Sequence, residues 1–199
     1  MECISFKNFL QSQVGITDGQ FEKILPYLQL EKVAKGHIIK NIKEEEGNLF
    51  FVDKGLLRFY SVDMMGKERI LQFAPENWFI GDRANLVESK SDKIALYNYQ
   101  IDAIEDSVVV RLASDYGSRI AKIEPEFIPI NERLLQKHIL HLQHRINLLI
   151  GSSVRERYED FIRMYPDLLQ RVPQWMIASY LGVTPEGLSR VRNFIAKEK

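Results

Sequence analysis

The stretch QWMIASYLGVTPEGLSRV, at Gln174–Val191, has the register of two short helices joined by a tight turn. The apolar positions that would pack these helices together are Ile177, Leu181, Leu188 and Val191. Ala178 is small, as a crossing helix requires, and Gly182 stands where a helix end often needs positive φ. Thr184 is a natural N-cap and Pro185 a natural first helical residue. The pattern predicts a helix-turn-helix, the module that places a short helix in the DNA major groove, with an ordinary helical hairpin as the alternative.

If Thr184 caps the second helix, one face of that helix projects away from its subdomain. The projecting side chains are then Pro185, Glu186, Ser189, Arg190 and Asn193. Glu186 can accept a hydrogen bond from a cytosine amino group, and Arg190 can bind guanine O6 and N7. An ion pair between Glu186 and Arg190 is the alternative role for Arg190.

Other positions of this helix are expected to hold the backbone of the nucleic acid or the core of the subdomain. The expected phosphate contacts, which position a helix without reading sequence, are Thr184, Ser189 and Arg192. The side chains expected to face back into the subdomain are Leu188, Val191 and Phe194.

The composition limits the kinds of protein that this chain can be. Its 199 residues suffice for one large or two small domains, and 45% of them are hydrophobic. Lys plus Arg and Asp plus Glu number 27 each, so DNA contact must come from a local basic patch. Cys3 is the single cysteine, which excludes an internal disulfide and an iron–sulfur cluster. The amino-terminal residues resemble neither a signal peptide nor a membrane span, so a cytoplasmic protein is expected.

In the amino-terminal part of the chain, the periodicity of the apolar residues changes at about residue 26. Residues 1–25 are predicted to be helical with a break at Gly15, and their apolar positions are Phe6, Phe9, Leu10, Phe21 and Ile24. Residues 27–113 contain short apolar runs such as NLFFVD, LLRFYSV and SVVVRLA. Turn signals separate these runs, for example Asp53-Lys54-Gly55 and Met65-Gly66-Lys67. This spacing predicts an antiparallel sandwich or barrel rather than βαβ units.

A long amphipathic helix is predicted over residues 126–150. Its apolar residues follow the 3–4 spacing of a coiled-coil seam, and the predicted dimer interface is Ile128, Leu135, Ile139, Leu142, Ile146 and Leu149. Leu134, Leu140 and Leu148 lie off this stripe, so the helix has apolar surface on two sides. The alternative is a helix that packs only on its own domain. The two-sided pattern favours a second subunit as one of two partners.

Three histidines on this helix, His138, His141 and His144, raise the question of a metal or haem ligand. Adjacent members could share one metal, but positions three residues apart drift around the helix, and no carboxylate partner is evident in the sequence. Solvated or capping histidines are therefore the preferred interpretation, and no metal site is predicted. We find no catalytic residues: the sequence contains neither a phosphate-binding loop nor a nucleophile elbow.

Basic residues and a tryptophan precede the helix-turn-helix. Arg155, Arg157 and Arg163 either lie near DNA phosphates or form surface ion pairs with neighbouring acidic residues, and the second interpretation is preferred. Trp175 is expected to be a core anchor, with a phosphate contact through its indole N–H as the alternative.

The combination of strands, a long helix and a terminal helix-turn-helix resembles the Crp/Fnr family of bacterial transcription regulators over nearly the whole chain. Trp78-Phe79-Ile80-Gly81-Asp82 is similar to the opening of that family's phosphate-binding cassette, and IASYLGVTPEGLSRVR is similar to its helix-turn-helix. The resemblance implies an α+β chain with an antiparallel, jelly-roll-like β-roll sensor domain. It also implies a homodimer that binds double-stranded DNA, with RNA polymerase as a candidate partner and no association with membranes.

The cassette departs from the nucleotide-binding pattern at the residues that would hold the ligand. Lys93-Ile94 replaces an Arg-Ser/Thr pair, which removes a bidentate contact to the cyclic phosphate and a hydroxyl donor. Cyclic AMP is therefore not the expected ligand. An unidentified small molecule in the β-roll would have as candidate contacts Gly81, Asp82, Arg83 and Lys93, and the β-roll as a plain scaffold is the alternative.

The sequence thus predicts a homodimeric, sequence-specific DNA-binding transcription regulator. We expect a β-roll domain at residues 1–124, a dimerisation helix at 125–151 and a helix-turn-helix domain at 152–199. The alternative function is a ligand-binding or protein-interaction module whose helix-turn-helix no longer reads DNA.

Overall fold

The computed structural model describes residues 3–41, 49–81, 98–113 and 115–198 of the chain. It divides into two compact units, which we describe separately. The first comprises residues 1–67 and 71–134, and the second comprises residues 68–70 and 135–199. Among the described helices, none combines the length and the apolar content that a membrane span requires.

The first unit begins with two helices, as the periodicity of residues 1–25 predicts. They are α1 (Ile4–Val14) and α2 (Asp18–Ile24), followed by the short 3₁₀ helix η1 (Leu25–Tyr27). Gly15 ends α1 in the left-handed conformation with φ +80°. Thr17 and Gln20 then form a capping box that starts α2. The predicted break at Gly15 is confirmed, and its cause is the positive φ that glycine adopts readily.

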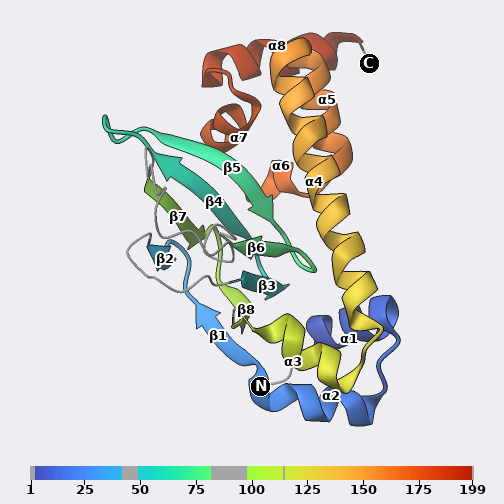
Figure 1. Cartoon of the computed structure of the whole chain (residues 1–199). Helices are drawn as coiled ribbons and strands as arrows, with labels where there is room; N and C mark the ends of the chain where they lie inside the picture. Colours follow the sequence, from blue (N-terminus) through green and yellow to red (C-terminus); the bar gives the residue numbers. More distant parts are fainter. Residues whose placement is uncertain (1–2, 42–48, 82–97, 114, 199) are drawn as a thin grey trace. The chain divides into compact units, whose positions relative to one another are not determined.

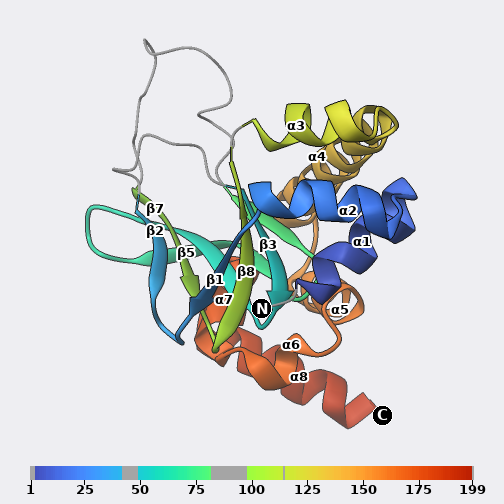
Figure 2. The same ribbon diagram turned by 90° about the horizontal axis from the view of Figure 1, so that it is seen from below.

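The described residues then contain eight strands, which are β1 (Gln29–Val33), β2 (Ile38–Asn41), β3 (Leu49–Lys54), β4 (Leu57–Val62), β5 (Glu68–Ala74), β6 (Phe79–Gly81), β7 (Asn98–Ala103) and β8 (Ser107–Leu112). The pairs β1–β8, β2–β7, β3–β6, β3–β8 and β4–β7 are antiparallel, as predicted. The strands form one sheet in the order β1-β8-β3-β6 and a second in the order β2-β7-β4-β5. Figure 2 shows α1 and α2 beside the sheet that contains β1, β8 and β3. The strand-rich domain of the sequence analysis is therefore confirmed as a two-sheet antiparallel fold.

Strand β3 is buried on both of its faces. Phe51 points into a cluster with α1, where its ring centroid lies 4.9 Å from that of Phe6 and 5.1 Å from that of Phe79. Phe50 and Val52, on the opposite face, belong to a second apolar cluster between the strands. A strand that is buried on both sides has a continuous apolar sequence, and residues 49–52, LFFV, have such a sequence.

One ion pair is buried in the other sheet of this unit. Arg58 on β4 donates from Nε and Nη2 to the two carboxylate oxygens of Asp102 on β7, each at 2.7 Å. The same guanidinium lies over the ring of Tyr60, 4.1 Å from its centroid. Bidentate geometry and burial make this a strong pair, provided that both partners are present.

The helices of the carboxyl-terminal half follow the predicted order. They are α3 (Tyr116–Ile123), α4 (Phe127–Gly151), α5 (Val154–Met164), α6 (Leu168–Arg171), α7 (Gln174–Leu181) and α8 (Pro185–Glu198) (Figure 1). The long helix predicted at 126–150 is confirmed as α4. Helices α3 and α6 are short and were not predicted individually. The division between the two units falls inside α4, between Leu134 and Leu135, and the predicted three-part domain bounds stay a prediction.

The core of the second unit is built from aromatic and aliphatic side chains of α5, α6 and α7. Phe161 lies against Tyr165 and Tyr180, with ring centroids 5.3 and 5.5 Å away. Leu168 and Ile177 are almost completely buried in the same unit. These helices are short, so burial of such side chains supplies the stability that isolated short helices lack.

Candidate nucleic-acid interface

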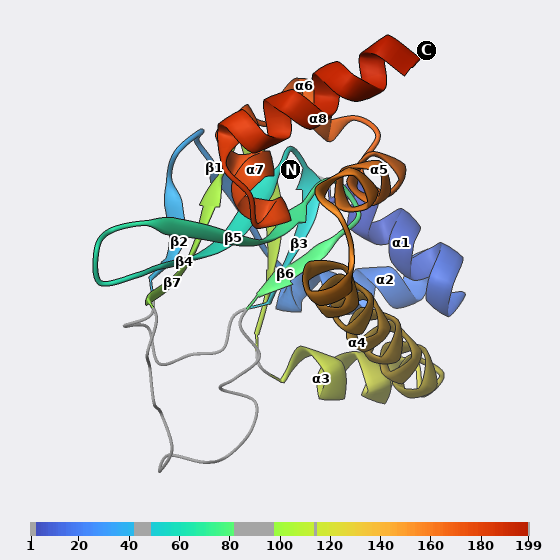
Figure 3. The same cartoon turned by 90° about the horizontal axis from the view of Figure 1, so that it is seen from above.

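The predicted helix-turn-helix is present with the predicted bounds and turn. Helix α7 ends at Leu181, and Gly182 follows in the left-handed region at φ +68° and ψ 36°. The Val183 amide donates to the Ala178 carbonyl at 3.0 Å and closes the turn. Helix α8 then begins at Pro185, and Figure 3 shows it crossing α7.

The packing of α7 and α8 uses most of the predicted apolar residues. Those that are almost completely buried are Ile177, Ala178, Leu181 and Leu188, while Val191 is half-buried. The prediction for Phe194 is wrong, because this side chain is 56% exposed. At about 100° per residue, Phe194 lies some 120° around the helix from Leu188. Ile195, seven residues after Leu188, is the half-buried residue that continues the packed face.

Thr184 caps α8 as predicted. The Gly187 amide donates to Thr184 Oγ1 at 3.1 Å, and the Leu188 amide donates to the Thr184 carbonyl at 3.0 Å. The Glu186 carboxylate accepts from its own amide and from the Thr184 hydroxyl, and these bonds, with the more distant Arg190 charge, lower the pKa of Glu186. Glu186 is therefore ionised at neutral pH and retains acceptor capacity at the start of α8.

The residues predicted to contact DNA share one face of the module. The exposed members are Thr184, Pro185, Glu186, Ser189, Arg190 and Asn193, whereas Arg192 is half-buried. At about 100° per residue, the exposed α8 members of this set cover roughly 140° of the helix, opposite the face that contains Leu188 and Val191. The structure thus brings the predicted base-reading side chains together, and their roles toward DNA stay a prediction.

The arginines of α5 make contacts within the protein. Arg155 is paired with Glu159 at 2.8 Å and with Glu198 of α8 at 2.7 Å, and the hydrogen bond to Glu198 is the largest cause of its raised pKa. Arg163 is paired with Asp160. For these two arginines the preferred interpretation, surface ion pairing, is confirmed.

Arg157 has a role that the sequence did not indicate. Its Nη1 donates to the carbonyl O of Leu181 at 2.7 Å, at the end of α7. Arg157 and Leu181 are 24 residues apart in the chain, and the acceptor is a main-chain carbonyl, so no local pattern in the sequence predicts this contact.

One histidine of α4, His144, has a carboxylate neighbour. His144 Nε2 lies 3.1 Å from Asp160 Oδ1 of α5, so the statement that no partner is evident is corrected. Burial lowers the pKa of His141, and the charges of His138 and Arg145 lower it further. Among the residues that the structure describes, no three His, Cys, Asp or Glu side chains are placed to share a metal ion.

Trp175 is not a core anchor. It is 43% exposed, because Trp175 lies on another face of the first turn than the buried positions of α7, which are Ile177, Ala178, Tyr180 and Leu181. The large apolar indole indicated burial, but the position of Trp175 in the helical period of α7 places it away from the buried face of this helix.

Of the four candidate ligand residues of the β-roll, only Gly81 belongs to the described residues. Gly81 is the last residue of β6 and is paired with Leu49 of β3. Asp82, Arg83 and Lys93 lie outside the described residues, and their proposed roles stay predictions.

The predicted dimer seam is an exposed apolar stripe along α4. Ile128, Ile139, Leu142, Ile146 and Leu149 are each between 40% and 54% exposed, and Leu135 is half-buried. Ile150, which is not among the predicted residues, is 82% exposed and lies about 60° from the centre of the stripe. Leu134 and Leu148, predicted to lie off the stripe, are half-buried, but Leu140 is 63% exposed.

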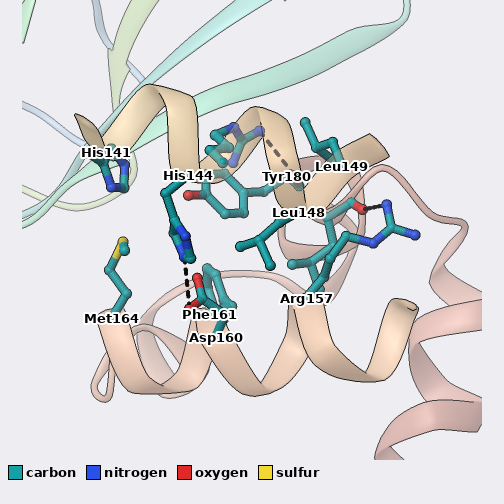
Figure 4. A pocket seen from close by; sticks show the side chains of 11 residues that line it. His141, His144, Leu148, Leu149, Arg157, Asp160, Phe161, Met164 and Tyr180 are labelled. Carbon is teal, nitrogen blue, oxygen red and sulfur yellow. Dashed lines mark hydrogen bonds and ion pairs between the residues drawn. The ribbon is translucent and has the colours of Figure 1, made fainter. Parts of the chain in front are cut away.

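A small pocket of about 20 Å³ lies among α4, α5 and α7 of the second unit (Figure 4). It is lined by His141, His144, Arg145, Leu148, Leu149, Arg157, Asp160, Phe161, Met164, Tyr180 and Leu181. This volume suits about one water molecule and is too small for an organic effector.

Neither a protein-family model nor a curated protein matches this sequence. Solved structures match it well. FixK2 from Bradyrhizobium japonicum has a TM-score of 0.70 at 18% identity, covering 86% of this chain and 85% of that one. A CooA variant from Carboxydothermus hydrogenoformans has a TM-score of 0.71 at 19% identity, covering 96% and 84%. A protein from Eubacterium rectale described as a transcriptional regulator of the Crp/Fnr family has a TM-score of 0.67 at 20% identity, covering 96% and 88%.

The chain therefore has the fold of the Crp/Fnr-type transcription regulators. Its two-sheet domain, long helix and terminal helix-turn-helix match these structures over most of the length of both chains. The predicted resemblance is confirmed for the fold.

Proposed function

We propose that the chain is a homodimeric, sequence-specific DNA-binding transcription regulator of the Crp/Fnr type. The observation that carries this proposal is the helix-turn-helix whose second helix buries Leu188 and exposes Glu186, Ser189 and Arg190 on the opposite face. These exposed side chains include an acceptor and a donor of the kinds that pair with base edges in the major groove. Two fold neighbours, the Eubacterium rectale protein and CLP from Xanthomonas campestris, are described as regulators, which adds support.

Dimerisation through α4 is the second element of the proposal. The stripe that includes Leu142 and Ile146 is apolar and exposed in the single chain, and burial of such side chains contributes about 25 cal/mol for each Å² removed from water. In a symmetric dimer, the same stripe of both chains would be covered. Two recognition helices could then lie about 34 Å apart, the spacing of successive major grooves on one face of B-DNA.

Regulation would follow from a change in the geometry of the paired α4 helices. A ligand could drive it only by binding one geometry better than the other. Two fold neighbours have different ligands, c-di-GMP for CLP and OCPA for CprK, so the fold does not fix the effector. We propose an effector other than cyclic AMP, with Asp82, Arg83 and Lys93 as candidate contacts. RNA polymerase is a proposed partner and the cytoplasm the proposed location.

Selection of an operator from random duplexes tests the DNA-binding proposal. Arg190→Ala should lose about 1–3 kcal/mol on the selected operator and much less on random duplex, because it reads bases. Arg192→Ala should weaken both duplexes about equally and reduce the salt dependence, because it holds phosphates. Equal losses for Arg190→Ala on the two duplexes would remove it from base readout. If wild type selects no duplex, the alternative function, a module that does not read DNA, is favoured.

Leu142→Glu tests the dimer. The substitution places a charge in the middle of the seam, where it would be buried without a partner, so the dimer should dissociate at micromolar protein concentration. Gln143→Glu, one position away and outside the centre of the stripe, is the control. Sedimentation of the Leu142 variant as an unchanged dimer would show that α4 is not the interface.

A further inference from the structure

The carboxyl end of α7 has a complete set of hydrogen-bond donors, and two of them come from other helices. The last four carbonyls of a helix have no partner inside it. In α7, the Ala178 and Ser179 carbonyls accept from the amides of Val183 and Gly182. The remaining two, those of Tyr180 and Leu181, accept from arginine side chains.

These arginines belong to the two helices that precede the helix-turn-helix. Arg145 of α4 donates from Nη2 to the Tyr180 carbonyl at 3.0 Å, and its guanidinium lies 3.5 Å from the centroid of the Tyr180 ring. Arg157 of α5 donates from Nη1 to the Leu181 carbonyl at 2.7 Å. A positive charge at a helix carboxyl end is favourable because of the helix dipole, and an arginine over an aromatic ring adds a cation–π attraction.

The turn itself packs against the same two helices. A Cβ atom built on Gly182 would lie 3.3 Å from Leu149 Cδ2 and 3.5 Å from Arg157 Nη1. Gly182 therefore serves both the positive φ of the turn and its close approach to α4 and α5. A pocket with room for about one water lies between these helices (Figure 4).

We propose that Arg145 and Arg157 are positioning residues that hold the helix-turn-helix at a fixed orientation to α4. They attach the last turn of α7 at two points, one from α4 and one from α5. In a dimer joined through α4, this attachment would set the separation of the two recognition helices and hence the half-site spacing that the protein accepts. The consequence for DNA rests on the proposed function, whereas the positioning itself is a property of the single chain.

Distance measurement between spin labels tests the positioning without DNA. Labels at Gln143→Cys on α4 and Lys197→Cys on α8, both exposed positions, would be placed in a Cys3→Ser background and diluted with unlabelled protein. The double variant Arg145→Met/Arg157→Met keeps the aliphatic volume and removes both ties. Its distance distribution should be about twofold broader than that of wild type, because helix carbonyls without partners promote fraying. Arg163→Met, which removes an arginine paired only within α5, is the matched control and should leave the distribution unchanged.

Lysine variants distinguish a loss of positioning from simple unfolding of the second unit. Arg145→Lys/Arg157→Lys keeps the charge and one donor at each site but loses the planar guanidinium, so its distribution should lie between those of wild type and the Met variant. A distribution as narrow as that of wild type in a folded Met or Lys variant would overturn the positioning role.

A half-site spacing series extends the test to DNA. Wild type should bind the selected operator about tenfold better than operators whose half-sites are one or two base pairs closer or farther apart. The folded Met variant should lose most of this preference while its affinity for random duplex is unchanged. An unchanged spacing preference would refute the proposal for DNA. If wild type selects no duplex, the proposed function fails, and the distance measurement still decides the positioning role.

Discussion

The two units of this chain are stabilised in different ways. In the first unit, sheets and helices enclose continuous apolar layers, and Phe50, Phe51 and Val52 of β3 are completely buried. In the second, short helices depend on side chains that satisfy their ends, such as Ser153 for α5, Thr184 for α8 and Arg157 for α7. A strand obtains main-chain partners from its neighbours along its whole length, whereas a short helix leaves a large share of its main-chain groups for side chains to satisfy.

The two tryptophans of the sequence allow the units to be followed separately. Trp78 belongs to the first unit and Trp175 to the second. A Trp175→Phe background therefore reports unfolding of the first unit, and a Trp78→Phe background reports unfolding of the second. Urea unfolding at constant protein concentration then gives a free energy of unfolding for each unit.

The largest effect is expected from Phe51→Ala. The side chain is completely buried among the rings of Phe6, Phe9 and Phe79, so its removal leaves a cavity. The free energy of unfolding of the first unit should fall by about 3–5 kcal/mol. Phe194→Ala is the control, and its loss should be small because that ring is mostly exposed. A loss below about 1 kcal/mol for Phe51→Ala would contradict the apolar-layer account of this unit.

A nearly equal loss is expected from Asp102→Ala, again in the first unit. The substitution leaves the buried Arg58 guanidinium without its carboxylate partner, which should cost about 3 kcal/mol. Glu31→Ala breaks a similar cross-strand pair with Arg111 that is more exposed, and it should cost no more than about 1 kcal/mol. Equal losses for the two variants would show that burial of the ion pair has no influence on its contribution.

A smaller effect is expected from Ser153→Ala in the second unit. The Ser153 hydroxyl accepts from the Glu156 amide at the start of α5, and the Glu156 carboxylate accepts from the Ser153 amide at 2.7 Å. Loss of this capping box should lower the free energy of unfolding of the second unit by about 1 kcal/mol. Ser152→Ala is the neighbouring control. An effect on the Trp78 signal instead of the Trp175 signal would contradict the separation of the units.

The smallest effect is expected in the pH dependence of the free energy of unfolding of the second unit. Burial and nearby positive charges lower the pKa of His141 below its ordinary value of 6.5. As pH falls below 6.5, the unfolded chain binds a proton at this position before the folded chain does, so stability should decrease until pH reaches the lowered pKa. His141→Gln should reduce this slope when the unfolding is followed through Trp175 between pH 5 and 8.

His37→Gln, in the first unit, is the control for the pH series. It should leave the pH dependence of the Trp175 transition unchanged. A wild-type second unit that becomes more stable as pH falls from 7 to 5 would show that the sign assigned to His141 is wrong.

Local chemistry made the helix-turn-helix predictable. Gly182, Thr184 and Pro185 each have a conformational preference that acts within a few residues, and the structure confirms the turn, the cap and the start of α8. The helix end at Gly15 was predictable for the same reason. Phe194 shows the limit of this reasoning, because hydrophobicity alone indicated burial while its helical phase places it on an exposed margin.

By itself, the sequence determined the order and kind of most elements, though not α3 and α6, as well as the helix ends at Gly15 and Gly182 and the apolar stripe of α4. These properties depend on residue preferences and on periods of two or about 3.6, which are local. Only the tertiary structure decided which distant residues meet: Arg58 with Asp102, His144 with Asp160, and Arg145 and Arg157 with the carbonyls of α7. Such contacts join positions far apart in the chain, and their partners include main-chain atoms that every residue possesses. No local pattern can therefore specify them, and the packing of the helices and strands selects them.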